Sequence, residues 1–407
     1  MFKKIDSSQL RVGMFIHDLN CDWMTHPFVR QRFLLGSEGD LRKIIDAGIH
    51  DVVIDSARGL DVQDAPTLAE AQAATERELT AIASAPPPVI AGVSLGEEMA
   101  RAAAIRDQAD ALVRSVMRDA RLGRVIELGH VQPVVQAITE SILRNPGALV
   151  GLLRIKAKDD YTFLHSVSVC TLLVAFCHSR GMDPERIYQA GLGGLLHDTG
   201  KALVPDRILN KPGPLTPDEF AVIQRHPQDG YDILRRSPDI GPIPLDIALH
   251  HHERRDGSGY PDRQDGDGIS ELAQMAAIVD VYDAITADRV YHKGMSAAGA
   301  LRKIYEWRKF HFNPQYTQEF MRCVGIYPVG TLVLLESGRL GVVIEPHPNN
   351  LLAPKVNVFF NTRSNLYIRP EMVDLSRGMG FGGADKIVGH ASAAQWNVDP
   401  MRFVNLA

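Results

Sequence analysis

Helical periodicity dominates the chain from about Gly96 to Gly325, where apolar residues recur every three or four positions. That spacing keeps apolar side chains on one face of a helix. One helix start is well marked, because Thr216 can serve as N-cap, Pro217 suits the first position and Glu219 can complete a capping box. We expect helices at about 161–180, 185–199, 217–236, 243–252, 271–288 and 296–308.

Patterns typical of strands flank this helical part. Near the N-terminus, "RVGMFIHDL" and "HDVVID" predict strands, and the helix between them would be capped by Ser37 or Asp40 and ended by Gly48. Near the C-terminus, "GTLVLLESGRLGVVIEP" and "KVNVFFNT" predict strands, with a turn at Ser337 and Gly338. The chain is therefore predicted to be mainly α, with β structure at both ends.

The domain boundaries follow from these changes of pattern. We expect a small α/β domain at 1–60, an all-helical domain at 96–325 with its core at 155–325, and a β-rich extension and tail at 326–407. Residues 61–95 are rich in Ala and Pro, so we expect a partly helical linker whose role is spacing.

Composition narrows the functional class. The 407 residues are 45% hydrophobic and 23% charged, and a net charge of −5 does not suggest binding to a nucleic-acid polymer or a membrane surface. No run of 18 apolar residues predicts a membrane span. The four cysteines form no C-x-x-C pair, which argues against a disulfide framework and for a reducing cytoplasm. The chain has neither a G-x-G-x-x-G nor a Walker A motif.

Polar residues capable of binding metal interrupt the apolar helical core. A single buried histidine is usually a hydrogen-bonded core residue, and a buried aspartate needs a compensating partner, because leaving it unpaired would cost several kcal/mol, roughly. Seven such residues in one helical core indicate a shared cause, a site for first-row divalent metals. They are His165, His197, Asp198, His226, His251, His252 and Asp280.

Two adjacent pairs among these residues suggest more than one metal ion. Neighbouring residues on a helix point about 100° apart, so a single ion cannot easily face both His197 and Asp198. Two ions a few ångströms apart could share Asp198, and His251 and His252 offer a second pair of ligands. Sites with two metals about 3.5–4 Å apart are typical of phosphoester hydrolysis.

The motifs that carry these residues resemble the HD-GYP domain family, a branch of the HD phosphohydrolase superfamily. They are "HDTGK" at 197–201, the histidine at 226, "HHERRDGSGYP" at 251–261 and "DVYDAITADRVYHK" at 280–293. The resemblance covers roughly residues 155–325, and the first sixty residues resemble a small domain often found ahead of it. It implies an HD-type helical core.

The resemblance also implies an activity. The family hydrolyses cyclic di-GMP to linear pGpG, in some members on to GMP, with a bi- or trinuclear iron or manganese centre. Tyr161 stands where trinuclear members carry a glutamate, so the resemblance implies two ions here. It also implies that a hydroxide bridging the two ions attacks the phosphorus atom. One ion would be held by His165, His197, Asp198 and Asp280, and the other by His226, His251 and His252, with Asp198 shared.

The resemblance is less complete at the residues that would contact the substrate. Lys201 would contact a phosphate oxygen and stabilise the developing charge, although it could also be a surface lysine. Arg289 matches a substrate-binding arginine, and Lys293 could assist it. Val290 and His292 depart from the family's "RPYR" pattern, which leaves the affinity for phosphate open.

The sequence allows two interpretations of each charged residue around these motifs. Glu253, Asp256 and Asp283 could orient ligand histidines or could be solvated charges. The glycine-rich stretch Gly257–Pro261 would shape a loop at the mouth of the site or a contact surface. His250 lies outside the ligand pattern.

Two alternatives to cyclic di-GMP hydrolysis stay open. The helical core could bind cyclic di-GMP, or a partner of the diguanylate-cyclase type, and signal with little turnover. It could also hydrolyse another cyclic dinucleotide or nucleotide. The linker and the amphipathic helix that follows it would allow a homodimer.

Overall fold

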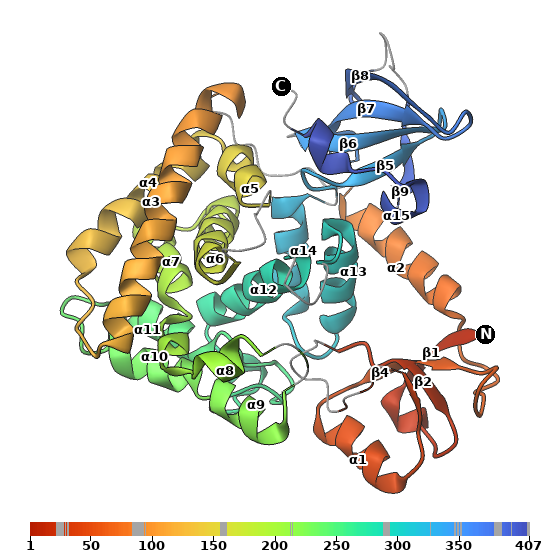
Figure 1. Cartoon of the computed structure of the whole chain (residues 1–407), viewed down its shortest axis with the longest axis horizontal. Coiled ribbons are helices and arrows are strands. Elements are labelled where there is room, and N and C mark those ends of the chain that lie inside the picture. The colour runs from red at the N-terminus through yellow and green to blue at the C-terminus, as the bar shows by residue number, and fades with distance from the viewer. Residues whose placement is uncertain are drawn as a thin grey trace.

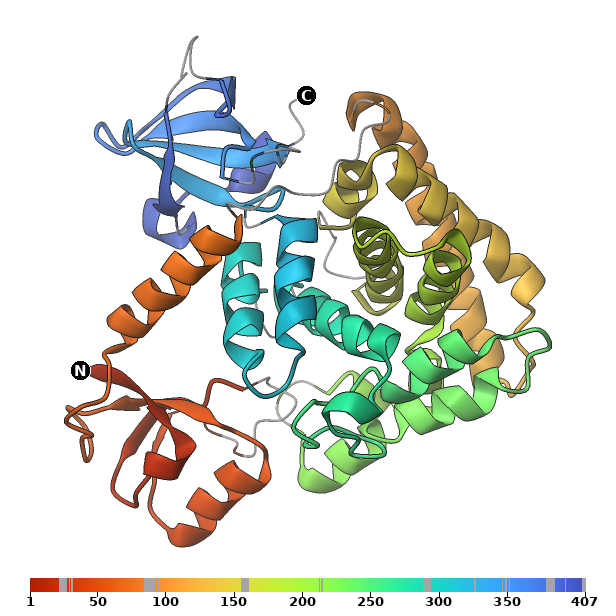
Figure 2. The same cartoon turned by 180° about the vertical axis from the view of Figure 1, so that it is seen from behind.

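The computed structural model describes residues 1–83, 93, 95–154, 161–287, 294–377 and 385–404, apart from 22–27, 29, 31, 212, 214, 326, 346, 348–349, 351 and 392. The chain is mainly α-helical, with one antiparallel sheet near each end. Figures 1 and 2 show the two sheets at opposite ends of helix α2 (Leu68–Ala83), both on the same side of the helical domain.

The N-terminal domain is a four-stranded antiparallel sheet covered by one helix. The strands β1 (Phe2–Asp6), β2 (Phe15–Asp18), β3 (Phe33–Leu34) and β4 (Asp51–Asp55) lie in the order β1-β4-β2-β3. Helix α1 (Glu38–Asp46) is capped by Ser37, and Gly48 follows it with a φ of +67°, as predicted. Its buried Ile44 packs into the core of this domain.

The sequence did not reveal strand β1, because two of its five residues are lysines. The Lys3 side chain is buried, and its ammonium group lies 3.0 Å from a carboxylate oxygen of Asp61 and 2.8 Å from the carbonyl oxygen of Val62. These partners compensate for the buried charge and allow a lysine in a strand.

Helix α2 occupies the segment that the sequence predicted to act as a spacer. It packs against α13 (Ala297–Trp307), where Arg302 donates to Glu76 at 2.7 Å and the Tyr305 hydroxyl donates to Glu78 at 2.8 Å. This segment therefore also makes contacts of its own, to α13 and to strand β1.

The helical domain is built around α6 (Tyr161–Ser179), which lies between other helices. Residues 165–177 are all buried, and the helix packs against α7 and α12. Besides α6 and α13, the α-helices of this domain are α3 (Leu95–Arg121), α4 (Leu128–Arg144), α5 (Pro146–Arg154), α7 (Pro184–Leu196), α8 (Asp206–Leu209), α9 (Pro217–Ile223), α10 (His226–Leu234), α11 (Pro242–His250), α12 (Glu271–Thr286) and α14 (Pro314–Val324).

The single helix predicted at 217–236 is wrong, since the structure has two helices, α9 and α10. The capping box predicted at Thr216 is present. The break follows from Pro227, which lacks a backbone N–H and whose ring would clash with the carbonyl of Ile223 in a continuous helix. That carbonyl instead contacts the ring of His226, so the break orients a predicted ligand.

The C-terminal sheet has five antiparallel strands in the order β8-β7-β6-β5-β9. Strands β5 (Leu332–Leu335), β6 (Arg339–Glu345) and β7 (Lys355–Asn361) match the predicted runs. Strands β8 (Leu366–Asp374) and β9 (Ile387–His390) and the short α15 (Ala393–Trp396) were not predicted. Strand β8 contains Pro370 and lies at the sheet edge, where a proline is tolerated because one side of the strand needs no partner.

Among the described residues, no helix combines the length and the apolar character that crossing a membrane requires.

Candidate metal centre

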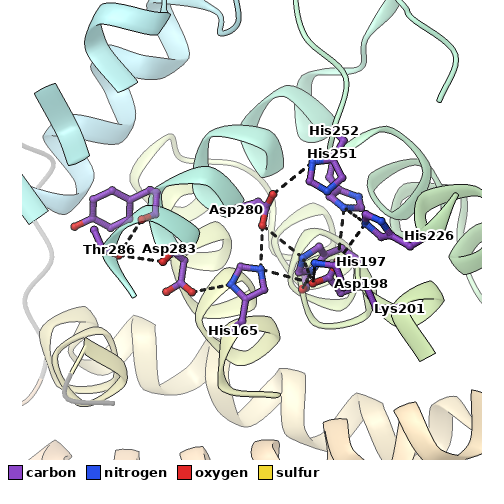
Figure 3. A network of polar contacts seen from close by, with 12 residues as sticks. His165, His197, Asp198, Lys201, His226, His251, His252, Asp280, Asp283 and Thr286 are labelled. Carbon is purple, nitrogen blue, oxygen red and sulfur yellow. Dashed lines mark hydrogen bonds and ion pairs between the residues drawn. The ribbon is translucent and has the colours of Figure 1, made fainter. Parts of the chain in front are cut away.

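Seven polar side chains from five helices converge at the centre of the helical domain (Figure 3). Each is at most 5% exposed. They come from α6, the C-terminal ends of α7 and α11, the N-terminal end of α10 and the middle of α12. They are the predicted ligands His165, His197, Asp198, His226, His251, His252 and Asp280.

Three of the histidines lie at helix ends and use the backbone there to orient their rings. His197 and His251 immediately follow α7 and α11, and His226 opens α10 after the break. In each, Nδ1 contacts the carbonyl oxygen three residues earlier, at 2.8, 3.0 and 2.7 Å for His197, His251 and His226. Carbonyls at helix ends lack helical partners, so they accept these N–H groups and leave Nε2 facing the cluster.

Asp198 lies between two sets of imidazoles. Its Oδ2 is 3.3 Å from Nε2 of His197 and 2.7 Å from Nζ of Lys201. Its Oδ1 is 3.4 Å from Nε2 of His226 and 3.8 Å from Nε2 of His251. One carboxylate thus faces histidines from α7, α10 and α11.

The other carboxylate of the cluster, Asp280, is contacted from two sides. Its Oδ1 lies 2.9 Å from Nε2 of His165, whose Nδ1 lies 2.7 Å from Oδ2 of Asp283. Its Oδ2 lies 3.9 Å from Nδ1 of His252. The His252 ring stacks on Tyr260, with centroids 4.8 Å apart.

Several buried polar atoms in the cluster lack hydrogen-bond partners within the described part of the chain. They are Nε2 of His197, Oδ1 of Asp198 and Nε2 of His252. In addition, Nε2 of His226 and Nε2 of His251 face each other at 3.2 Å. Unsatisfied buried polar atoms are costly, and two imidazole nitrogens that face each other can share at most one proton. A bound cation would satisfy these atoms together, so the residues fit a metal.

The protonation states of five members of the cluster also suit a metal. Burial lowers the pKa of His226 to about 4 and holds the pKa values of His251 and His252 well below 6.5. Burial opposes ionisation of Asp198 and Asp280, but the neighbouring histidines outweigh it and keep both pKa values well below 3.8. Neutral imidazoles and ionised carboxylates are the forms that bind first-row divalent ions.

The ligand atoms fall into overlapping groups in which every atom lies within 4.8 Å of the others. Each of these groups shares a residue with the next, so the ligand atoms form one continuous cluster. The groups are His165 with His197 and Asp280, His197 with Asp198 and His251, and His226 with His251 and His252.

The structure does not test every predicted site residue. Arg289 and Lys293, expected at a substrate phosphate, fall outside the residues that the structure describes, as do Val290 and His292. His250, which we left out of the ligand set, lies between two carboxylates of its own, with Nδ1 2.6 Å from Asp246 and Nε2 3.1 Å from Asp262.

Asp283, Glu253 and Asp256, whose roles the sequence left open, make three different kinds of contact in the structure. Asp283 orients a predicted ligand, since it contacts Nδ1 of His165. Glu253 accepts from the backbone amides of residues 262 and 264 and so shapes the loop after the paired histidines. Asp256 contacts His50 of the N-terminal domain at 2.8 Å.

Sequence reasoning missed the stacking of Tyr260 on His252 and the carbonyls that orient three of the rings. The carbonyls carry no side-chain signal. The position of Pro227 directly after His226 was the one available sign, because it marks a helix break beside a ligand.

Comparison with known proteins gives matches to both halves of the chain. A family model described as a domain of unknown function, DUF3391, matches residues 2–131, and one described as an HD domain matches residues 151–316. A Pseudomonas aeruginosa protein named as a cyclic di-GMP phosphodiesterase is 46% identical over 398 residues, which span 98% of this chain and 94% of that protein.

Two other relatives match a smaller part of the chain. A Xanthomonas campestris cyclic di-GMP phosphodiesterase response regulator is 38% identical over 164 residues, 39% of this chain and 42% of that protein. A Vibrio cholerae protein named as a 3'3'-cGAMP-specific phosphodiesterase is 33% identical over 165 residues, 40% of this chain and 32% of that protein.

Proposed function

Because this chain belongs to the HD-GYP family of HD-domain phosphodiesterases, we propose that it hydrolyses cyclic di-GMP to linear pGpG at the buried histidine–aspartate cluster. The observation that carries the proposal is the position of Asp198, whose two oxygens face different sets of histidines. The similarity to a cyclic di-GMP phosphodiesterase over nearly the whole chain supports the choice of substrate.

In this proposal the cluster holds two divalent ions, with iron or manganese the expected metals. When bound, such ions supply an activated water and neutralise negative charge on the phosphate. His165, His197 and Asp280 would be ligands of one ion and His226, His251 and His252 of the other. Asp198 would be shared between them.

Lys201 would act on the substrate side of this centre. Its side chain is 17% exposed, whereas the Asp198 side chain beside it is 4% exposed, and its ammonium group lies 2.7 Å from Oδ2 of Asp198. The more exposed lysine would contact a phosphate of the substrate. The ammonium group would then stabilise the negative charge that develops on a phosphate oxygen.

The similarity to a 3'3'-cGAMP-specific phosphodiesterase over 40% of this chain supports one further candidate, hydrolysis of a mixed cyclic dinucleotide. The substrate panel should therefore hold cyclic di-GMP and 3'3'-cGAMP side by side. Faster turnover of cyclic di-GMP is expected.

The test is chromatography of the nucleotide after incubation with protein loaded with iron or manganese. We expect cyclic di-GMP to disappear and pGpG to form. The variant with His197→Ala and Asp198→Ala should lose both metal and turnover. A matched control replaces His17 and Asp18, another adjacent pair that lies on strand β2, and should keep both.

Full activity in the first variant would refute the assignment of the site. A wild-type protein that holds metal and binds cyclic di-GMP without converting it would refute hydrolysis. That result would favour a signalling protein that acts by binding the nucleotide or a protein partner.

A further inference from the structure

A second histidine–carboxylate cluster lies between the N-terminal domain and the helical domain. It consists of His50, which directly precedes β4, Asp256 in the loop after α11, and His311 in the segment after α13. One ligand atom from each lies within 4.8 Å of the other two. None of the three belongs to the central cluster.

The Asp256 carboxylate is oriented toward both imidazoles. Its Oδ1 accepts from the backbone N–H and the hydroxyl of Ser258, at 3.0 and 2.6 Å. Its Oδ2 lies 2.8 Å from Nε2 of His50 and 3.8 Å from Nε2 of His311. The nitrogen–oxygen distances in the central cluster cover a similar range, from 2.9 to 3.9 Å.

Contacts within the protein hold the ring of His50 and the backbone of His311. The His50 ring stacks on Phe310, with centroids 3.9 Å apart and an interplanar angle of 14°. The carbonyl oxygen of His311 accepts from the backbone N–H of Arg255 at 3.0 Å, which ties the loop of Asp256 to the segment of His311. Ligands held in this way lose little conformational freedom on binding.

The two domains also approach each other closely beside the cluster. Gly48 has a φ of +67°, and a Cβ built there would lie 2.9 Å from Cβ of Ser258. Strand β1 adds an ion pair across the same boundary, with Nζ of Lys4 2.5 Å from a carboxylate oxygen of Glu306. These contacts hold His50 against the helical domain.

The cluster is partly open to solvent, unlike the central one. The side chains of His50, Asp256 and His311 are 33%, 18% and 22% exposed, which leaves room for water to complete a coordination shell. Burial, together with the charge of Arg254, lowers the pKa of His311 to about 4, so this imidazole is neutral. Its Nε2 lies 3.4 Å from the carbonyl oxygen of Gly48, and a metal ion would replace that contact.

We propose that His50, Asp256 and His311 bind one divalent first-row metal ion of the Zn²⁺ type, which joins the N-terminal domain to the loop after α11. Two imidazoles and a carboxylate, with water in the open position, form a ligand set that Zn²⁺ accepts readily. This proposal does not depend on the proposed activity.

The ion would act on a loop that reaches the central cluster. Tyr260 lies four residues after Asp256, and its ring stacks on the predicted ligand His252. An ion at the boundary would therefore restrain the segment that carries this contact and link the N-terminal domain to the central site.

The experiment measures bound zinc in the full-length protein after loading with ZnCl₂ and desalting. The variants His50→Ala and His50→Gln should each bind one equivalent less than the wild type. The control His130→Ala removes a histidine whose side chain is 80% exposed and should bind as much as the wild type. Zinc held by the central cluster is common to all these proteins and cancels in the comparison.

The thermal midpoint gives a second readout. Zinc should raise the thermal midpoint more in the wild type and in His130→Ala than in either variant of His50. Only the wild type and His130→Ala can bind the ion that joins the two domains. Equal zinc content in the wild type and both variants of His50 would overturn the proposal. His50 and Asp256 would then form only a hydrogen-bonded contact between domains.

Discussion

Replacing Gly200 with alanine should disable the central cluster without removing any polar group from it. Gly200 lies in the 3₁₀ turn Thr199–Leu203, two residues after Asp198. A Cβ built there would lie 2.0 Å from the carbonyl oxygen of His226 and 2.5 Å from the backbone nitrogen of Gly230. Both atoms belong to the backbone of α10, so no side-chain rotation can relieve the clash.

The size of the effect follows from these distances. Cβ atoms essentially never approach other heavy atoms within 3.0 Å, so the turn and α10 must separate by at least about 1 Å. Overpacking of this kind costs about 1–3 kcal/mol of stability. The displacement also acts directly on the 3.4 Å separation between Asp198 and His226. A misplacement of ~1 Å at a catalytic site can lower turnover ~100-fold.

The assay compares cyclic di-GMP turnover, metal content and thermal midpoint across three alanine variants. A Cβ at Gly129 in α4 would meet nothing within 4 Å, so Gly129→Ala should keep full turnover and gain up to about 1 kcal/mol of stability. A Cβ at Gly230 would lie 3.2 Å from the nitrogen of Gly200, so Gly230→Ala should give an intermediate loss. Wild-type turnover and stability in Gly200→Ala would refute the reasoning.

Three further variants test separate parts of the site. Lys201→Met should lower kcat about 10²–10³-fold while the metal content stays unchanged. If the metal content fell together with kcat, the role of the lysine would instead be to hold Asp198 in place. Asp283→Asn should weaken metal binding about 10–100-fold in a metal titration, because His165 loses its carboxylate partner, and an unchanged affinity would exclude that role. Burial opposes protonation of His250, but its carboxylate partners Asp246 and Asp262 raise the pKa of the imidazole above 6.5. The stability that the protonated imidazole adds to the fold is therefore fully present below pH 6.5 and is lost as the pH rises through the raised pKa. The thermal midpoint of His250→Gln should therefore depend less on pH above 6.5 than that of the wild type, and identical pH profiles would contradict this.

The helical fold could be predicted because most of its signals are local. Periodicity and caps depend on residues close in sequence, as at Thr216, where the predicted capping box is present. Strand β8 could not be predicted, since it contains Pro370 and exposes much of its surface at a sheet edge. The prediction of one continuous helix at 217–236 was wrong, because it followed the helical spacing of apolar residues and gave too little weight to Pro227, which marks a break.

The residues of the central cluster could be selected from the sequence, but their orientation could not. Buried polar residues in an apolar helix are visible in sequence because they are costly without partners. The carbonyls that orient His197, His226 and His251 belong to the backbone and leave no trace in residue identity. The contact between His50 and Asp256 joins residues 206 positions apart, which no local pattern reports.

The most direct test of the central claim is a titration of cyclic di-GMP turnover with manganese or iron, starting from protein freed of metal. It is best run on the His50→Ala variant, so that an ion at the domain boundary does not contribute. If the cluster is a two-metal centre, the metal-free protein should be inactive, and turnover should rise until two equivalents are bound. Turnover without metal, or full turnover at one equivalent, would contradict this account.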